Sequence, residues 1–277
     1  MSQWYEESFG REYLELYAHR DVAEARADIE AIVRLIDPPR DEPLLDLCCG
    51  ACRHLLILRE MGFSQLVGLD LSAELLEVGA QALTSEGGEA SGSEATGGEA
   101  SECVLLVCSD MRAIPYEDHF ATVLSLFTSF GYFERDEENQ AVLEAVFKAL
   151  RPGGMFLIDY LNRDHVIAHL VERDEQVLPG WRIQHVRCLT EGCRRVEKTT
   201  TVIADDGPPG ATLSWLRSAY TYRESVRMYS ADEMEGMLRA AGFVHIRRYG
   251  TLAGQAFGPQ SARLILVAEK NEQDVQD

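Results

Sequence analysis

The chain has 277 residues, 46% of them apolar, and a formal net charge of −20, so we expect one substantial core and no nucleic-acid partner. No apolar run is long enough to cross a membrane, and the polar start MSQWYEESFGREY does not resemble a signal peptide, so we expect a cytoplasmic protein. The odd number of cysteines, seven, argues against a disulfide framework, and the single C-x-x-C pair without a second such pair or a His pair argues against a metal site.

The first expected element is a helix over residues 2–20. Tyr13, Tyr17 and Arg20 are spaced by four and three residues, so they share one face of that helix. This pattern is typical of a surface helix with two half-buried tyrosines. A second helix with an apolar stripe is expected over residues 22–36, before a pair of prolines.

The next stretch, LLDLCCGACRHLLILREMGFSQLVGLDLS, predicts a strand, a tight turn at Gly50, a helix over residues 55–61 and a second strand that ends at Asp70. A glycine lets the backbone approach a ligand closely, and the new helix points free N–H groups at the same place. Asp70 follows Gly50 by 20 residues, where an acid accepts ribose hydroxyls. The second glycine of a dinucleotide-binding loop is absent, because Cys52 stands there.

Residues 84–101 are a low-complexity Gly/Ser/Glu/Ala segment, which predicts a flexible loop without a function of its own. A third strand, 103–109, then leads to Asp110. A fourth strand, 122–126, leads to the aromatic loop 127–133, which would lie at the carboxyl edge of an α/β sheet, where ligands bind.

The later chain changes from alternating helices and strands to a run of strands. Three β-prone segments between Gln176 and Tyr229 indicate an inserted antiparallel sheet, and Ser230-x-x-Glu233 indicates a helix start with a capping box. The remaining expected elements are helices over 73–83 and 136–150, a breaker turn at 151–154, and strands over 155–160, 243–249 and 262–269.

These motifs resemble those of the class I S-adenosylmethionine (SAM) dependent methyltransferases. Their first motif commonly reads D-x-x-C-G-x-G-x, and Asp46, Cys49 and Gly50 match it, whereas Cys52 replaces a glycine. GLDLS resembles the ribose-binding segment of the family. CSDM, VLSLFTSFGYF and LRPGG resemble the following motifs, in order and at suitable spacing. The resemblance covers residues 10 to 160 well and the rest loosely.

The resemblance implies an α/β fold, Rossmann-like, with a seven-stranded and mostly parallel sheet that has helices on both faces and an inserted antiparallel β lid. It implies the strand order 3-2-1-4-5-7-6 with an antiparallel final strand. We therefore expect an N-terminal helical lid over 1–37, a SAM-binding core over 38–175, a β lid over 176–229 and the end of the core over 230–277.

The resemblance also implies the site residues. The expected SAM contacts are Tyr13, Tyr17, Arg20, Asp46, Cys48, Gly50, Asp70, Leu71, Asp110, Met111 and Leu126. The expected substrate pocket is formed by Phe127, Ser129, Phe130, Tyr132, Asn162, Tyr222 and Arg227. Tyr132, Asn162 and Tyr222 are catalytic candidates, but no motif fixes a base, and each of the seven histidines is expected to be structural.

The expected function is methyl transfer from SAM to a small molecule, by N- or O-methylation in metabolite or natural-product biosynthesis, with S-adenosylhomocysteine as the other product. The D/N-P-P-Y/F motif of nucleic-acid and protein methylation is absent after the fourth strand. Two alternatives stay open. One is attack on the γ-carbon of SAM itself, which gives a cyclic amino acid such as azetidine-2-carboxylate and methylthioadenosine. The other is a non-catalytic SAM-binding protein, which the loss of glycine at Cys52 favours. We expect a monomer or homodimer.

Overall fold

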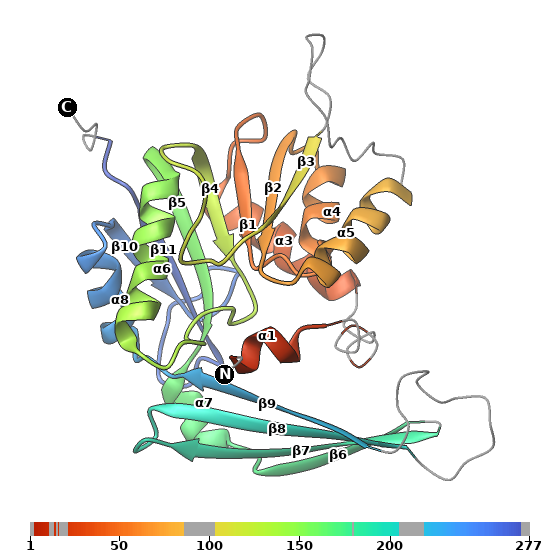
Figure 1. Cartoon of the computed structure of the whole chain (residues 1–277). Helices are drawn as coiled ribbons and strands as arrows, with labels where there is room; N and C mark the ends of the chain where they lie inside the picture. The colour runs from red at the N-terminus through yellow and green to blue at the C-terminus, as the bar shows by residue number, and fades with distance from the viewer. Residues whose placement is uncertain are drawn as a thin grey trace.

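The computed structural model describes residues 3–10, 14, 16, 22–85, 103–178, 180–204 and 219–272. In these residues the strands form one seven-stranded and one four-stranded sheet, and the smaller sheet lies beyond one end of the strands of the larger (Figure 1). The large sheet has the order β10-β11-β5-β4-β1-β2-β3, and β11 runs antiparallel to both neighbours. This confirms the predicted α/β class and strand order.

The parallel strands of the large sheet are short apolar runs, as expected for strands covered on both faces. Every residue of β1 and β4 is buried. The strands are β1 (Leu44–Leu47), β2 (Gln65–Asp70), β3 (Cys103–Cys108), β4 (Phe120–Ser125), β5 (Leu150–Leu161), β10 (Val244–Tyr249) and β11 (Arg263–Glu269).

Two apolar layers cover the large sheet, one on each face. One layer is packed under α3 (Val22–Ile36), α4 (Arg53–Glu60) and α5 (Ala73–Ser85). The other is packed under α6 (Asp136–Ala149) and α8 (Ala231–Ala240). No helix of the described residues is long and apolar enough to cross a membrane.

Local signals define the helix ends. The predicted capping box is present at α8, where the Glu233 N–H donates to Ser230 Oγ over 3.1 Å and the Ser230 N–H donates to Glu233 Oε2 over 2.7 Å. After Ile36, Asp37 adopts a left-handed conformation with φ of 43° and its N–H donates to the Val33 carbonyl over 2.9 Å. That arrangement ends α3 before the prolines.

The turn predicted over residues 151–154 is wrong, because β5 already begins at Leu150. Phe120 pairs with Leu150 but Thr122 pairs with Met155, so the extra residues are taken up by an irregularity in the β4–β5 register. The backbone of this segment also pairs with the end of β11, where the Gly153 N–H donates to the Lys270 carbonyl over 2.9 Å. The segment is therefore an irregular part of β5, with Gly153 at a φ of 75°, and not a separate turn before the strand.

The four-stranded sheet contains β6 (Arg173–Leu178), β7 (Trp181–Thr190), β8 (Arg195–Ala204) and β9 (Ala219–Arg227), all antiparallel. The sequence predicted the last three. It missed β6, an exposed edge strand whose sequence RDEQVL has no apolar alternation, and the short α7 (Arg163–His169).

The single N-terminal helix predicted over 2–20 is wrong. Helix α1 (Trp4–Ser8) ends after five residues, and the chain bends at Phe9 and Gly10. Ser8 Oγ donates to the Trp4 carbonyl over 2.8 Å and also lies 3.3 Å from the Arg223 carbonyl of β9. Helix α1 therefore lies between the two sheets and contacts the small one (Figure 1).

A buried arginine joins the small sheet to the core. Arg227 is 2% exposed, and its Nε lies 3.1 Å from Asp136 Oδ1 at the start of α6. Its guanidinium also donates to the Met228 carbonyl over 2.8 Å and lies over the Tyr229 ring at 4.4 Å. Tyr229 donates its hydroxyl to the same Asp136 Oδ1 over 2.7 Å.

We predict that Arg227→Met lowers the free energy of unfolding by about 2 kcal/mol, because it removes hydrogen bonds of a buried charge. Arg194→Met is the matched control. Arg194 pairs with the same carboxylate from an exposed position, so its loss should cost at most about 1 kcal/mol. Urea unfolding of both variants measures the difference, and equal midpoints would contradict this role for Arg227.

Candidate functional site

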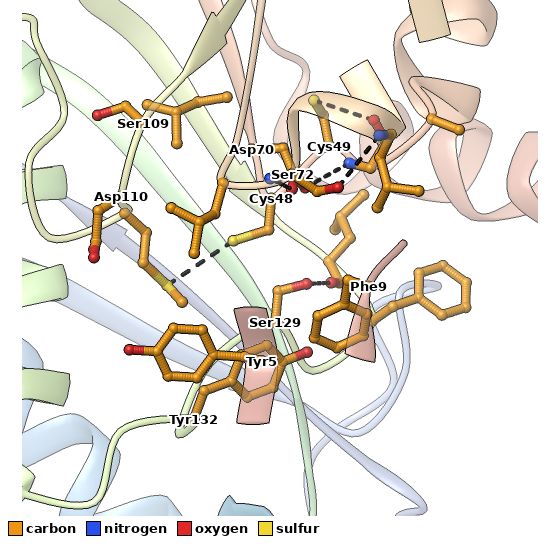
Figure 2. Close-up of a pocket in the computed structure, with 18 of the residues that line it drawn as sticks. Tyr5, Phe9, Cys48, Cys49, Asp70, Ser72, Ser109, Asp110, Ser129 and Tyr132 are labelled. Atoms are coloured by element: carbon orange, nitrogen blue, oxygen red, sulfur yellow. Dashed lines mark hydrogen bonds between the residues drawn. The ribbon is translucent and has the colours of Figure 1, made fainter. Parts of the chain in front are cut away.

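A cavity of about 570 Å³ lies at the carboxyl ends of β1 to β4 (Figure 2). The chain runs from β1 towards β2 and β3 on one side and returns to β4 and β5 on the other, so strand order reverses beside β1. Such a point is where open α/β sheets bind ligands. The loops that follow these four strands, the start of α4 and residues of α1 form its walls.

The loop after β1 alternates into the left-handed region. Cys48, Gly50 and Cys52 have φ values of 63°, 54° and 65°. The N–H groups of Cys48 and Cys49 both donate to the Leu69 carbonyl, over 2.7 and 3.1 Å, which folds the loop over the end of β2. A Cβ at Gly50 would meet only Leu75 Cδ1, at 4.0 Å, so the protein itself leaves room there and the glycine serves the φ angle and close approach from the cavity.

Asp70 presents its carboxylate to the cavity from the end of β2. Its Oδ2 accepts the Gly50 N–H over 2.8 Å and its Oδ1 accepts the Ser72 N–H over 2.9 Å. Burial raises the pKa of Asp70 above its usual range, and these two hydrogen bonds oppose that rise. The result is a partly buried acid with lone pairs left to accept hydroxyl groups.

Asp110 lies beyond β3 and is held by Arg112. Arg112 Nε is 3.0 Å from Asp110 Oδ1, and Nη2 is 2.6 Å from Oδ2. Burial on its own raises the pKa of Asp110, but the hydrogen bonds and charge of Arg112 outweigh it and the pKa is lowered. The same guanidinium lies over the Phe133 ring at 4.1 Å, so the Asp110–Arg112 pair fixes this wall of the cavity.

Aromatic rings close the other half of the cavity. Tyr132, from the loop after β4, packs against Trp4 and Phe9 with ring-centre distances of 5.0 and 5.8 Å. Tyr5 packs edge-on against Phe133 at 5.4 Å. Figure 2 shows Tyr5 and Tyr132 on the side of the cavity away from Asp70. Helix α1 therefore supplies a wall of the cavity and not only a cover.

His54 lines the cavity from the first turn of α4, stacked on Phe127 with ring centres 5.5 Å apart. Its Nδ1 lies 3.7 Å from Asp46 Oδ2, which is longer than a hydrogen bond. Its Nε2 is buried without a partner among the described residues. Asp46 is 1% exposed and lies behind the cavity rather than on it.

The structure brings most of the predicted site residues to this cavity. Its lining includes Cys48, Gly50, Asp70, Leu71, Asp110, Met111, Leu126, Phe127, Ser129 and Tyr132. Tyr13, Tyr17 and Arg20 lie outside the described residues.

Five predicted residues do not line the cavity: Asp46, Phe130, Asn162, Tyr222 and Arg227. Phe130 is 2% exposed and packs against Tyr160 and Tyr229. Asn162 caps α7 and donates to the Ser261 carbonyl over 2.7 Å. Tyr222 is buried in the small sheet beside Ile183.

Sequence reasoning missed Tyr5, Phe9, Arg53 and His54. Tyr5 and Phe9 are four residues apart, which is the spacing of one helix face, and that signal was available. Arg53 and His54 directly follow the glycine loop at a helix start, a position that faces the ligand in this type of fold.

Comparison with known proteins agrees with this geometry. Residues 44–154 match the model of a methyltransferase domain. The chain is 29% identical over 229 residues, 80% of this chain and 84% of the other, to a dTDP-3-amino-3,4,6-trideoxy-alpha-D-glucopyranose N,N-dimethyltransferase of Streptomyces venezuelae. In sequence the chain is therefore similar to methyltransferases that act on small molecules.

Solved structures share the methyltransferase fold over nearly the whole chain. A SAM-dependent methyltransferase from Clostridium acetobutylicum superimposes with a TM-score of 0.72 at 15% identity, covering 93% of this chain and 95% of the other. A sugar N-methyltransferase from Streptoalloteichus superimposes with a TM-score of 0.66 at 18% identity, covering 95% and 94%.

The cavity fits SAM, which is bound in the structure of a similar amino pentose methyltransferase from Micromonospora echinaspora. Asp70 is a partly buried acceptor with free lone pairs, Gly50 has no Cβ on the cavity side, and aromatic faces line the far half, where they attract a cation. When bound, SAM supplies a methyl group that its sulfonium makes electrophilic.

Cys52 replaces the usual motif glycine, and Gly79 of α5 makes room for it. Cys52 is fully buried and begins α4 in the left-handed conformation. A Cβ built at Gly79 would lie 2.4 Å from Cys52 Sγ and 3.0 Å from its Cβ. The missing side chain at Gly79 therefore leaves the space that the Cys52 side chain occupies. Cys52 does not fill the cavity.

We predict that Gly79→Ala destabilises the protein by about 1 to 3 kcal/mol, because the new methyl group overpacks against Cys52. Adding Cys52→Gly should restore stability and SAM affinity, since it removes the atoms that clash and suits the left-handed conformation. Thermal unfolding and calorimetric titration of the single and double variants measure this. Additive losses in the double variant would show that the two sites are independent.

We predict that SAM binding weakens as pH falls through the raised pKa of Asp70, because protonation removes an acceptor and a negative charge. The sign follows from the raised pKa, since the carboxyl gains its proton at a higher pH than an exposed acid does. Asp70→Asn should bind SAM on the order of a hundredfold more weakly and lose this pH dependence. Calorimetry across pH measures both, and a wild-type profile identical to that of Asp70→Asn would contradict the assignment.

Proposed function

We propose that this methyltransferase transfers the methyl group of SAM to an amine nitrogen of a small molecule of the amino-sugar type. The relative from Streptomyces venezuelae is named for N,N-dimethylation of a dTDP-amino sugar, which supports the acceptor class. The enclosed, ring-lined half of the cavity suits a small acceptor, and the net charge of −20 disfavours a nucleic acid.

In this proposal Asp70 accepts the ribose hydroxyls of SAM, and Asp110 with Met111 contacts the adenine. Asp110 remains ionised beside Arg112 and can still accept from an amino group. Gly50 and the start of α4 face the methionine part, where free helix N–H groups favour a carboxylate.

The position of His54 is our reason for proposing an amine nitrogen, and not a hydroxyl oxygen, as the methyl acceptor. A hydroxyl acceptor needs a base when it attacks, whereas a neutral amine attacks with its own lone pair and loses its proton afterwards. His54 is the imidazole on the described lining, but its Nε2 is buried and its Nδ1 faces Asp46. Because Nε2 is buried and Nδ1 lies beside an acid, we assign these residues the role of orienting the acceptor rather than that of a base.

The aromatic half of the cavity also favours an amine. Methylation of an amine leaves a positively charged nitrogen, and faces of aromatic rings attract cations. Among the described lining residues the carboxylates are Asp70 and Asp110, which belong to the loops after β2 and β3. Phe127 and Tyr132 then provide the surface that the charged product nitrogen meets.

The test is to incubate the protein with SAM and pairs of sugars that differ only by an amine or a hydroxyl, both free and linked to a nucleoside diphosphate. Mass spectrometry should show S-adenosylhomocysteine and one or two methyl groups on the amine of each accepted pair, and no methylated hydroxyl partner. Methylation of the hydroxyl sugars alone would overturn the proposal. Methylthioadenosine from SAM without an acceptor would show that SAM is itself the substrate.

A further inference from the structure

Two consecutive residues at the acceptor wall adopt an unfavourable backbone conformation. Phe127 and Thr128 have φ values of 57° and 56°. Neither is glycine, and threonine is β-branched, so the left-handed region is costly for both. Such strain persists only where surrounding contacts hold it, and it is frequent at functional sites.

We propose that Asp159 and Arg263, which do not line the cavity, are positioning residues that hold the Phe127–Thr128 turn and thereby set the acceptor wall. The proposal rests on the function proposed above, because it assigns the purpose of the turn to acceptor alignment. It adds two residues to the catalytic apparatus that no sequence motif indicated.

Asp159 holds the turn through both its side chain and its backbone. It is 2% exposed in β5, next to β4, from which the turn emerges. Its Oδ2 accepts the Phe127 N–H over 3.0 Å, and its backbone carbonyl accepts the Thr128 N–H over 3.0 Å. Both strained residues therefore donate their backbone N–H groups to one buried residue, Asp159.

Arg263 in turn fixes the Asp159 carboxylate. It comes from β11, which pairs with β5, and its Nε donates to Asp159 Oδ1 over 2.7 Å while Nη2 donates to Oδ2. This is the two-pronged geometry that arginine makes and lysine cannot. Its Nη1 also lies 3.6 Å from Asp28 Oδ2 on α3, so a second acid holds the guanidinium in place.

The ring of Phe127 shows what the turn achieves. It contacts His54, with ring centres 5.5 Å apart, and the Arg53 guanidinium, 4.2 Å from the ring centre. Arg263 approaches the same ring at 5.5 Å. If the turn relaxed to ordinary φ angles, Phe127 would leave these contacts, Ser129 would shift with it, and this wall of the cavity would move.

The test compares Asp159→Asn and Arg263→Lys with Arg247→Lys. Arg247 is the matched control, an arginine of the neighbouring strand β10 that pairs with Glu269 at the surface. The first two variants should lower kcat for an amine acceptor on the order of a hundredfold, as displaced reactants do. SAM affinity, measured by calorimetry, should stay within about twofold in all three.

A second substitution separates positioning from general support of the fold. Thr128→Gly removes the cost of the left-handed conformation, so adding it to Arg263→Lys should recover much of the lost kcat. A structural defect elsewhere would not respond to glycine at this position. Unchanged kcat in both Asp159→Asn and Arg263→Lys, or no recovery with Thr128→Gly, would overturn the proposal.

A readout without an acceptor keeps this test independent of the proposed function. With para-fluorophenylalanine at position 127, fluorine NMR should give one resonance in the wild-type background and a shifted or second resonance in Asp159→Asn and Arg263→Lys. Failure of the wild type to methylate any amine, with these spectra as expected, would refute the amine substrate but not the positioning of the turn. Identical spectra in all variants would refute the positioning itself.

Discussion

The hydrogen bond between the Gly50 N–H and the Asp70 carboxylate determines the arrangement of the cofactor half of this enzyme. It joins the loop after β1 to the end of β2, and the loop is fixed further by two N–H groups on the Leu69 carbonyl. Burial disfavours the charged form of Asp70, and the backbone donors compensate for part of that cost. A partly buried carboxylate is thereby held in place to accept hydroxyl groups.

The acceptor half depends on contacts between parts of the chain that are distant in sequence. Helix α1 provides Tyr5 to the cavity and the bend after it provides Phe9, and Ser8 connects the same helix to β9. The small sheet is joined to α6 through Arg227 and Asp136. The shape of the cavity on this side therefore depends on how the small sheet packs on the core and on a turn that the Asp159–Arg263 ion pair holds.

The sequence predicted the features that depend on neighbouring residues, and it missed those that depend on contacts between distant parts of the chain. The glycine loop, the acid after β2 and the capping box are short patterns with one physical meaning, and each lies where it was expected. Asn162 and Tyr222 were placed in the pocket because they follow or belong to strands near it. Periodicity does not say which face of an inserted sheet meets the core, or whether a side chain is already used as a helix cap.

The strained turn and the missed helix end show the same limit. No pattern in FTSFGY announces two left-handed residues, because their conformation is imposed by Asp159, some 30 residues later in the chain. Likewise, the tyrosine spacing over 13–20 suggested a single long helix, whereas Ser8 and Gly10 end α1 early. The helical spacing of residues 2–20 did not predict the contact between Ser8 and β9, a strand more than 200 residues later in the chain.

The place of β3 in the sheet has a practical consequence. It is an edge strand, and the chain enters it at Cys103, at the amino end of the sheet, whereas the cavity lies at the carboxyl ends. The connection from Ser85 to Cys103 therefore begins and ends on the side of the core remote from the chemistry. A fluorescent reporter or an immobilisation tag placed between these two points would leave the entrance to the catalytic chamber clear, which makes this connection a suitable handle for building a sensor or a supported catalyst from the enzyme.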